Sequence, residues 1–391
     1  MDYSFSDRIK DLSGNAIREI FKLLSSPEII SFAGGMPATA CLPAAEVKRY
    51  SAECIEQDPV GVLQYGNTEG YLPFRKTLAD YIRRTGIEGM ELDNILAISG
   101  GQQGIDLMCK CFLNTGDRVL VQTPTYLAVL HILKTYEAEV HGIASDEEGL
   151  DLEDLENKIK KYSPKFVYLV PNFLNPTGKT LGTEKRKRAL EICSEYGVVI
   201  VEDDPYRELR YSGEALPAIK SFDKEGLVVY LTSFSKTVSP GMRVGGAFGD
   251  AKLIRKLTIG KQAVDVHTNS LAQAIVNKMI INGDLDRNIA RAVPIYREKR
   301  DAMISALEKY MPDSFEFTRP DGGLFIWGEF KDGKDVVENF KKAVSNNVAY
   351  VSGTDFFADG VSGRNCMRLN FSNATLEQIE RGVKALAKTF A

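Results

Sequence analysis

A single lysine lies among residues that suit a reactive amine. Lys236 belongs to the stretch SFSKTVSPGMRVGG, which runs from residue 233 to residue 246. The fixed cation of Arg243 disfavours the charged form of a nearby lysine, and the neutral amine is the form that attacks an aldehyde. Ser233, Ser235 and Arg243 are hydroxyl and guanidinium donors of the kind that bind phosphate. The stretch therefore predicts a site for an aldehyde that carries a phosphate, as pyridoxal 5′-phosphate (PLP) does.

Three further motifs offer groups for the ring of such a molecule. The apolar run VVIVED ends in acids, and Asp203 is an anion that could keep a pyridine nitrogen protonated. Asn175, in NPTG, and Tyr206 are candidate partners of the ring hydroxyl. Tyr126, in TPTY, is a candidate to stack on the ring face. An ordinary Asn-Pro turn, and a helix cap at Asp203 or Asp204, remain alternative interpretations of two of these motifs.

A glycine-rich turn predicts where the phosphate would sit. In SGGQQGID (99–106), a strand is expected to end and a helix to begin, so that Gly101 and Gln102 would offer free backbone N–H groups to an anion. The glycine spacing does not match GxGxxG, and NPTGKT lacks the first glycine of a Walker A motif. A plain strand-to-helix turn is the alternative for this stretch.

These candidates follow short apolar runs, which we interpret as strands that alternate with helices. A helical face between the first two strands would contain Ile105, Met108, Cys109 and Phe112. Such alternation predicts a mostly parallel sheet with helices on both faces, and ligands beyond the carboxyl ends of its strands. The expected strands are Ile95–Ser99, Val119–Gln122, Phe166–Val170, Val198–Glu202, Val228–Thr232 and Val244–Phe248.

The last third of the chain has a different pattern. Strand-like runs at 322–330, 347–353 and 366–372 follow charge-rich helical segments, and they predict a second, smaller α+β unit. We expect a large domain at residues 46–285. The small domain would combine residues 1–45 with residues 286–391.

Composition narrows the class of protein. The formal net charge is −4 and no long block of like charge occurs, so a nucleic-acid partner is not expected. The first residues lack a signal-peptide pattern, and no apolar run approaches the roughly 20 residues of a membrane span. We therefore expect a cytoplasmic protein that does not bind a membrane. Only three histidines occur and none is paired at ligand spacing, so no metal site is predicted.

Taken in order, these motifs resemble the fold-type I PLP-dependent aminotransferases of class I/II. The chain is most similar to the 2-aminoadipate and kynurenine aminotransferase subgroup, whose typical opening resembles IREIFKLLSSPEIISFAGGMP (17–37). The resemblance covers nearly the whole chain and implies an aspartate aminotransferase-like fold with a seven-stranded sheet. The matching motifs are GGMP (34–37), QYGNTEGY (64–71), SGGQQG (99–104), PTY (124–126), NPTG (175–178), EDDPY (202–206), SFSKTVSPGMRVG (233–245) and MRLNFS (367–372).

The resemblance also implies roles that the residue pattern alone does not give. Arg368 would bind the α-carboxylate of the substrate beside Asn175, although a plain strand residue is the alternative for it. Gly35 would contact the substrate through its backbone. Tyr65 would touch the phosphate in the neighbouring subunit, which requires a homodimer with shared active sites. Arg18 would meet a side-chain carboxylate, or else be an ordinary exposed helix arginine.

The implied reaction moves an amino group from an L-amino acid to a 2-oxo acid such as 2-oxoglutarate. Lys236 would form the Schiff base with PLP and shuttle the substrate proton, in a ping-pong scheme. Glutamate, 2-aminoadipate, aromatic and leucine-like donors are all compatible with the sequence. The alternatives are a lyase or decarboxylase on the same fold, and the ligand-sensing domain of a transcription regulator. Such a regulator would need an N-terminal winged-helix domain, for which we expect no room before Gly34.

Overall fold

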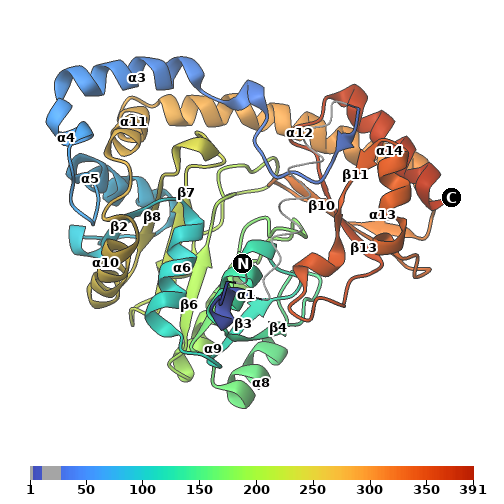
Figure 1. Ribbon diagram of the computed structural model, residues 1–391, viewed down its shortest axis with the longest axis horizontal. Helices are drawn as coiled ribbons and strands as arrows, with labels where there is room; N and C mark the ends of the chain where they lie inside the picture. The colour runs from blue at the N-terminus through green and yellow to red at the C-terminus, as the bar shows by residue number, and fades with distance from the viewer. Residues whose placement is uncertain (1–2, 11–27) are drawn as a thin grey trace.

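A computed structural model describes residues 3–10 and 28–391. Its centre is a seven-stranded sheet in the order β2-β8-β7-β6-β5-β3-β4 (Figure 1). All neighbouring pairs are parallel except those of β8, which runs antiparallel to both β2 and β7. The mostly parallel seven-stranded sheet expected from the sequence is therefore confirmed. Its strands are β2 (Ile95–Ile98), β3 (Arg118–Gln122), β4 (Glu139–Ile143), β5 (Phe166–Leu169), β6 (Val199–Asp203), β7 (Val228–Ser233) and β8 (Gly245–Phe248).

The strands form where the sequence offers apolar residues for both faces of a sheet. Side chains of β5 pack into two separate core clusters, with Phe166 and Tyr168 in one and Val167 and Leu169 in the other. Helices cover both faces, and the amphipathic helix expected after β2 is present with Ile105 and Met108 buried. The helices of this part are α3 (Ala44–Gln57), α4 (Pro59–Leu63), α5 (Leu72–Tyr81), α6 (Gly101–Phe112), α7 (Leu127–Thr135), α8 (Leu152–Tyr162), α9 (Thr183–Glu195), α10 (Ala251–Asp265) and α11 (Ser270–Ile281).

One strand of the large sheet was not expected from the sequence. Strand β4 lies at the sheet edge and pairs only with β3. Its residues include Glu139 and His141, and most of its side chains are only partly buried. An edge strand that faces solvent does not need the continuous apolar run that identifies a central strand.

A second sheet lies beside the first and has the order β12-β13-β10-β9 (Figure 1). The short strand β1 (Ile30–Ser31) pairs in parallel with β11 (Val348–Ala349), which ties the early chain to this part of the molecule. Strand β9 (Phe315–Phe317) was not expected from the sequence. The other strands are β10 (Phe325–Phe330), β12 (Val351–Ser352) and β13 (Cys366–Asn370), and the accompanying helices are α12 (Asp284–Tyr310), α13 (Val336–Ser345) and α14 (Leu376–Phe390).

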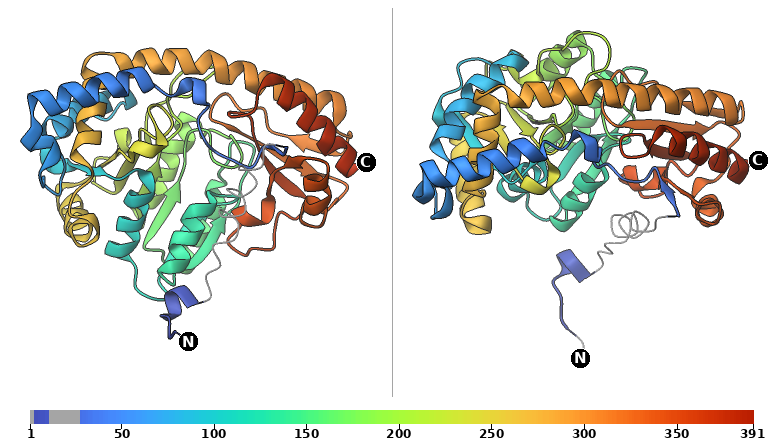
Figure 2. Two further views of the ribbon diagram at one scale, coloured as in Figure 1. Left: turned by 45° about the horizontal axis from the view of Figure 1, so that its top comes forward. Right: turned by 90° about the horizontal axis from the view of Figure 1, so that it is seen from above.

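The long helix α12 connects the two parts of the molecule. It has 27 residues and extends past both sheets along one side (Figure 2). The predicted domain boundary between residues 285 and 286 falls in its first turn; the domain limits themselves stay predictions. The separate short helix α1 (Asp7–Lys10) contacts α7. Within residues 3–10 and 28–391, no helix combines the length and apolar character needed to cross a membrane.

Candidate active site

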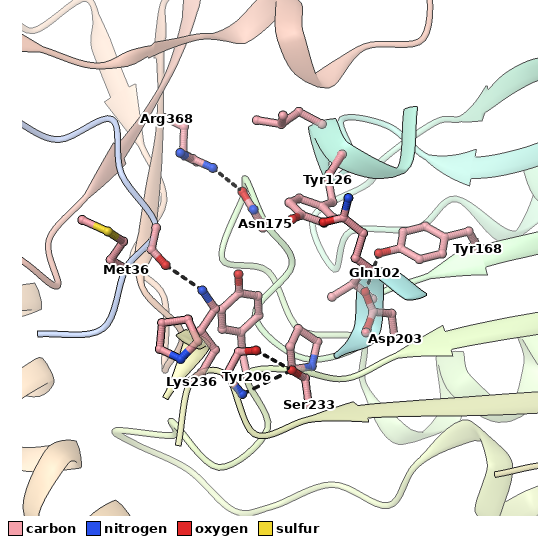
Figure 3. A pocket seen from close by; sticks show the side chains of 18 of the residues that line it. Met36, Gln102, Tyr126, Tyr168, Asn175, Asp203, Tyr206, Ser233, Lys236 and Arg368 are labelled. Atoms are coloured by element: carbon pink, nitrogen blue, oxygen red, sulfur yellow. Dashed lines mark hydrogen bonds between the residues drawn. The ribbon is translucent and has the colours of Figure 1, made fainter. Parts of the chain in front are cut away.

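A pocket of about 380 Å³ lies beyond the carboxyl ends of β5, β6 and β7. Its far wall comes from the N-terminal segment and from β13, so both parts of the molecule form it (Figure 3). Most of the residues singled out in the sequence line this one pocket: Gly35, Gly101, Gln102, Tyr126, Asn175, Asp203, Tyr206, Ser233, Ser235, Lys236, Arg243 and Arg368. Ala33, Met36, Leu127, Ala128, Tyr168, Val170, Pro205 and Pro240 complete the lining.

The direction of β8 explains how Arg243 reaches the pocket. Because β8 is antiparallel, it begins where β2 and β7 end, and Gly245 is paired with both Ile98 and Ser233. An added Cβ at Gly245 would lie 2.5 Å from the carbonyl oxygen of Thr232, so only glycine permits this close pairing. Arg243, two residues before Gly245, therefore lies at the sheet edge where the parallel strands end.

Donors for an anion gather around the start of α6. Arg243 donates from Nη1 to the Ser235 hydroxyl (3.3 Å) and from Nη2 to the Ser99 carbonyl (2.9 Å). The Ser233 hydroxyl lies 3.0 Å from that of Ser235. Gly100 has φ 85°, and a Cβ there would come within 2.5 Å of Arg243, so glycine is required at the turn. The first N–H groups of α6 have no intrahelical acceptor, and the cluster can hold a phosphate.

Three consecutive acids at the end of β6 have different partners. Glu202 accepts hydrogen bonds from the backbone N–H groups of Ile219 and Lys220, both at 2.8 Å. Asp204 accepts two hydrogen bonds from the Asn172 amide and one from the Tyr230 hydroxyl. Ile219 and Lys220 begin a short 3-10 helix, so Glu202 caps it from a distance, whereas within the described residues neither Asp203 nor Asp204 caps a helix. The contacts of Glu202 and Asp204 leave the carboxylate between them, Asp203, as the acid that faces the pocket.

Asp203 is buried, and none of the described cations forms an ion pair with it. Its one side-chain partner among the described residues is Tyr168, whose hydroxyl donates to Oδ2 at 2.7 Å (Figure 3). Burial raises the pKa of Asp203 to about 7, against the lowering effect of the Tyr168 hydrogen bond. A protonated ring nitrogen would provide the missing positive partner. Tyr168 was missed in the sequence, although a tyrosine inside the buried strand FVYL needs a hydrogen-bond partner and signals a polar neighbour.

Lys236 follows β7 and points across the pocket toward the N-terminal segment. Its Nζ donates to the carbonyl oxygen of Gly35 at 2.6 Å (Figure 3). Burial lowers the pKa of Lys236 to about 8, and the positive charges of Arg368 and Arg243 act in the same direction. At physiological pH a larger fraction of this amine than of an ordinary lysine is therefore neutral and nucleophilic.

Arg368, on β13, is a buried cation with open hydrogen-bonding capacity. Its guanidinium lies 4.4 Å from the ring centre of Phe325 and 5.1 Å from that of Phe356. Nη1 donates to Asn175 Oδ1 (3.0 Å) and Nη2 to the Ala33 carbonyl (2.6 Å), whereas Nε is buried and has no partner in the described part of the chain. Burial lowers the pKa of Arg368 to about 10. No described carboxylate forms an ion pair with it, so the site can accept a carboxylate from a ligand.

Aromatic residues form the side walls. Tyr126 precedes α7, and Tyr206 packs edge-on against Phe325 with ring centres 5.9 Å apart. Burial raises the pKa of both tyrosine hydroxyls, so both are neutral donors at ordinary pH. Together with Asn175 they surround the space between Asp203 and Lys236 (Figure 3).

Two candidates from the sequence are not among the pocket residues. Tyr65 does not line the pocket of its own chain, and it is 82% exposed with its ring edge toward His267. Arg18 lies outside the described residues.

Comparisons with known proteins identify the family of the chain. The family model described as "Aminotransferase class I and II" matches residues 27–386, and the chain belongs to this family. Aromatic-amino-acid aminotransferase 1 of Thermococcus litoralis is 41% identical over 396 residues, which cover 100% of this chain and 95% of the relative. The chain is thus an aminotransferase, as the motifs indicated.

Two solved structures are similar over nearly their whole length. Kynurenine aminotransferase of Pyrococcus horikoshii, solved with PMP, is 41% identical with a TM-score of 0.94, covering 98% of this chain and 96% of that one. The α-aminoadipate aminotransferase of Thermus thermophilus, complexed with N-(5′-phosphopyridoxyl)-L-leucine, is 36% identical with a TM-score of 0.91 and the same coverages. The fold-type I architecture and the PLP cofactor expected from the sequence are confirmed.

The residues of the pocket fit PLP. The cofactor carries a phosphate, a basic ring nitrogen and an aldehyde. The pocket offers an anion-binding turn beside Arg243, the cation-free carboxylate of Asp203 and the amine of Lys236. The Nε of Arg368, which has no described partner, could bind a further ligand group.

Proposed function

We propose that Lys236 binds the cofactor aldehyde and then carries the substrate proton. The observation that supports this most strongly is its position in one pocket with the cation-free Asp203 and the anion-free Arg368. When bound, PLP supplies a ring that accepts the electron pair left behind as the substrate Cα loses its proton. Lys236 would hold the cofactor through its aldehyde, and its neutral Nζ would then be the base that removes and returns the substrate proton.

The other pocket residues would orient the reacting groups. Asp203 would hold the proton on the ring nitrogen, and Tyr168 would hold Asp203. Asn175 and Tyr206 would donate to the ring hydroxyl oxygen, and Tyr126 would stack on the ring. The phosphate would bind the N–H groups of Gly101 and Gln102, the hydroxyls of Ser233 and Ser235, and Arg243.

Substrates would bind through their α-carboxylate to Arg368, with Gly35 and Asn175 beside it. Two carboxylate oxygens match the planar fork of a guanidinium, and the phenyl rings of Phe325 and Phe356 keep that fork in place. Apolar walls at Met36, Leu127 and Ala128 would accept aromatic and leucine-like side chains. The relatives named for aromatic amino acids, kynurenine and α-aminoadipate support a broad donor range. The acceptor that we propose is 2-oxoglutarate.

The decisive experiment is a half-reaction. Holoenzyme mixed with an amino acid alone should convert its cofactor to the pyridoxamine form, which is followed by absorbance. Lys236→Ala should retain PLP and lose at least about 10⁴-fold of this rate, because nucleophile and base are removed together. Cofactor conversion at an undiminished rate in Lys236→Ala would disprove the role of this lysine. Production of carbon dioxide or elimination of the side chain would indicate a decarboxylase or lyase instead.

A panel of donors would resolve the specificity. Glutamate and 2-aminoadipate should depend on Arg18 if it contacts a side-chain carboxylate. Arg18→Gln should then lower kcat/KM for these two donors and leave leucine and phenylalanine unchanged. An equal effect on all four donors would assign Arg18 no part in selectivity.

We further propose a homodimer in which Tyr65 contacts the phosphate of the partner's site. Tyr65 follows α4, where Val60 (72% exposed) and Leu63 (63%) are also turned outward, as at a surface that another subunit covers. Coexpressed Tyr65→Ala and Lys236→Ala chains test this arrangement. A mixed dimer regains one intact site only if Tyr65 acts across the interface, so activity should exceed that of either variant alone. No gain in a verified mixed dimer would place Tyr65 in its own subunit's site or in none.

A further inference from the structure

A fully buried lysine lies next to the phosphate-binding turn but does not line the pocket. Lys261, on α10, has none of its surface exposed. Its Nζ donates to both carboxylate oxygens of Asp265, at 2.6 and 2.7 Å, and to Oε1 of Gln103 at 3.1 Å. Burying a lysine is costly unless its charge and its donors are matched, and here the amine has both a carboxylate and an amide oxygen as acceptors.

Lys261, Asp265 and Gln103, which we call the Lys261 cluster, lie against the turn that begins α6. Gln103 Oε1 accepts the backbone N–H of Ser99 at 2.8 Å, so this side chain bridges the two ends of the Ser99–Gln103 turn. Asp265 Oδ2 accepts from Gln103 Nε2 (2.7 Å) and from the Ser99 hydroxyl (3.0 Å). The residues enclosed by these bonds are Gly100, Gly101 and Gln102; the last two were assigned above to the phosphate.

The cluster also reaches Arg243. The carbonyl of Ser99 accepts from Arg243 Nη2 at 2.9 Å, so one residue touches both the buried charges and the phosphate-binding arginine. A displacement of Ser99 would therefore change the direction of the N–H groups and of the guanidinium together. Phosphate binding depends on the simultaneous alignment of such donors.

We propose that Lys261, Asp265 and Gln103 are positioning residues that hold the turn at Ser99–Gln103 in its phosphate-binding shape. The charge balance within the cluster supports a specific role. An unpaired Asp265 carboxylate beside the turn would repel a phosphate, and Lys261 cancels that charge. The inference rests on the proposed phosphate site.

The test compares PLP with pyridoxal, which has the same ring and aldehyde but no phosphate. Affinities of both for the apo-enzyme are measured by fluorescence titration, with inorganic phosphate as a competitor. Lys261→Met should weaken PLP about tenfold or more, as loss of a supporting residue does in other preorganised sites, and weaken phosphate competition in parallel. Pyridoxal affinity should change less than about twofold. The double variant Lys261→Met/Asp265→Asn should bind PLP better than Lys261→Met, because no unpaired carboxylate remains.

A matched control separates positioning from general stability. Lys220 is a similarly buried lysine, paired with Asp223 at 2.8 Å, and it does not line the pocket. Lys220→Met should lower the melting temperature without changing the ratio of PLP to pyridoxal affinity. If Lys261→Met does not fold, the affinities for PLP and pyridoxal are compared in Asp265→Asn and Gln103→Met instead.

The outcomes distinguish a failure of the proposed phosphate site from a failure of the proposed positioning role. If the wild-type chain binds PLP no better than pyridoxal, the proposed phosphate site itself fails. If wild-type binding favours PLP and the cluster variants keep that preference, the positioning role is wrong and the cluster only stabilises the fold. Equal weakening of PLP and pyridoxal would lead to the same rejection.

Discussion

The two walls of the active-site pocket differ in origin and in chemistry. One wall, which we call the sheet edge, consists of residues that end or follow β2, β5, β6 and β7, including Asp203 and Lys236. The opposite wall, which we call the cover, consists of residues 33–36 and Arg368. The sheet edge supplies the phosphate donors, an acid and an amine. The cover supplies backbone carbonyls, an apolar side chain and one cation.

Under the proposed function, this difference would separate catalysis from substrate binding. The groups on the sheet edge match the parts of PLP, and its residues are fixed by strands buried on both faces. In the proposed function, substrate contacts would come mainly from the cover, where no described carboxylate pairs with Arg368 and Met36 is 37% exposed. Substitutions on the two walls should therefore affect different steps. Cofactor electronics should depend on the sheet edge, and the apparent affinity for amino acids on the cover.

The largest effect among the variants that test this division should come from Asp203→Asn. The neutral amide cannot keep the ring nitrogen protonated, so the ring is a poorer electron acceptor, and we expect kcat to fall about 10³-fold. PLP should still bind through its phosphate and through Lys236. Single-turnover absorbance with a fixed donor measures the loss. A kcat within about tenfold of wild type would show that Asp203 is not the partner of the ring nitrogen.

Arg368→Lys should weaken substrate binding by the cover and leave cofactor binding by the sheet edge unchanged. A lysine keeps the charge but loses the planar fork and its stacking against Phe325 and Phe356. We expect kcat/KM for every amino donor to fall about 10²-fold, mostly through KM, with PLP affinity unchanged. Steady-state kinetics measure the change in kcat/KM, and a PLP titration measures the affinity for the cofactor. A large loss of PLP affinity would contradict the separation of the two walls.

Tyr168→Phe should give a smaller effect from within the sheet edge. It removes the one side-chain hydrogen bond to Asp203, at 2.7 Å, and changes little else in shape. The loss of one such bond corresponds to roughly a three- to tenfold decrease in kcat, because Asp203 is held less firmly. KM should stay constant. A change in KM alone would show that Tyr168 acts on the substrate rather than on Asp203.

The last effect concerns the stability of the apo-protein and not the rate of the reaction. The pKa of Asp203 is about 7 in the folded chain and near 3.8 when unfolded, so the folded state binds the extra proton between these values. Stability should fall as the pH rises from about 4 to 7, and the loss should be complete above about pH 7. Asp203→Asn should remove about 1–3 kcal/mol of this decline, measured by urea unfolding at about pH 5 and about pH 8. An identical decline in both proteins would show that Asp203 is not the group responsible.

Most of the sheet edge could be predicted because its residues lie just after apolar runs. The strands that end at Asp203 and Ser233 are buried on both faces, and such strands are visible as short apolar segments. The carboxyl ends of parallel strands meet at one edge, so the residues that follow them converge. Strand β4 was missed because its half-exposed edge position does not demand that pattern.

The contacts of the cover and of the Lys261 cluster could not be predicted from local sequence patterns. Arg368 contacts Ala33 across 335 residues of sequence, and Lys261 contacts Gln103 across 158. No periodicity or turn signal specifies such pairs, since they follow from how helices and sheets pack. The role of Arg368 came from the family resemblance, and the cluster was not predicted at all.

The sequence by itself therefore determined the sheet, its order of motifs and the chemical groups available at its edge. It did so because burial and strand geometry impose a pattern that each segment carries locally. Only the tertiary structure decided which of the three acids at 202–204 stays without a full set of partners, and what surrounds Arg368. Those properties depend on partners brought in from distant segments, and a lone charge is recognisable only when its whole surroundings are known.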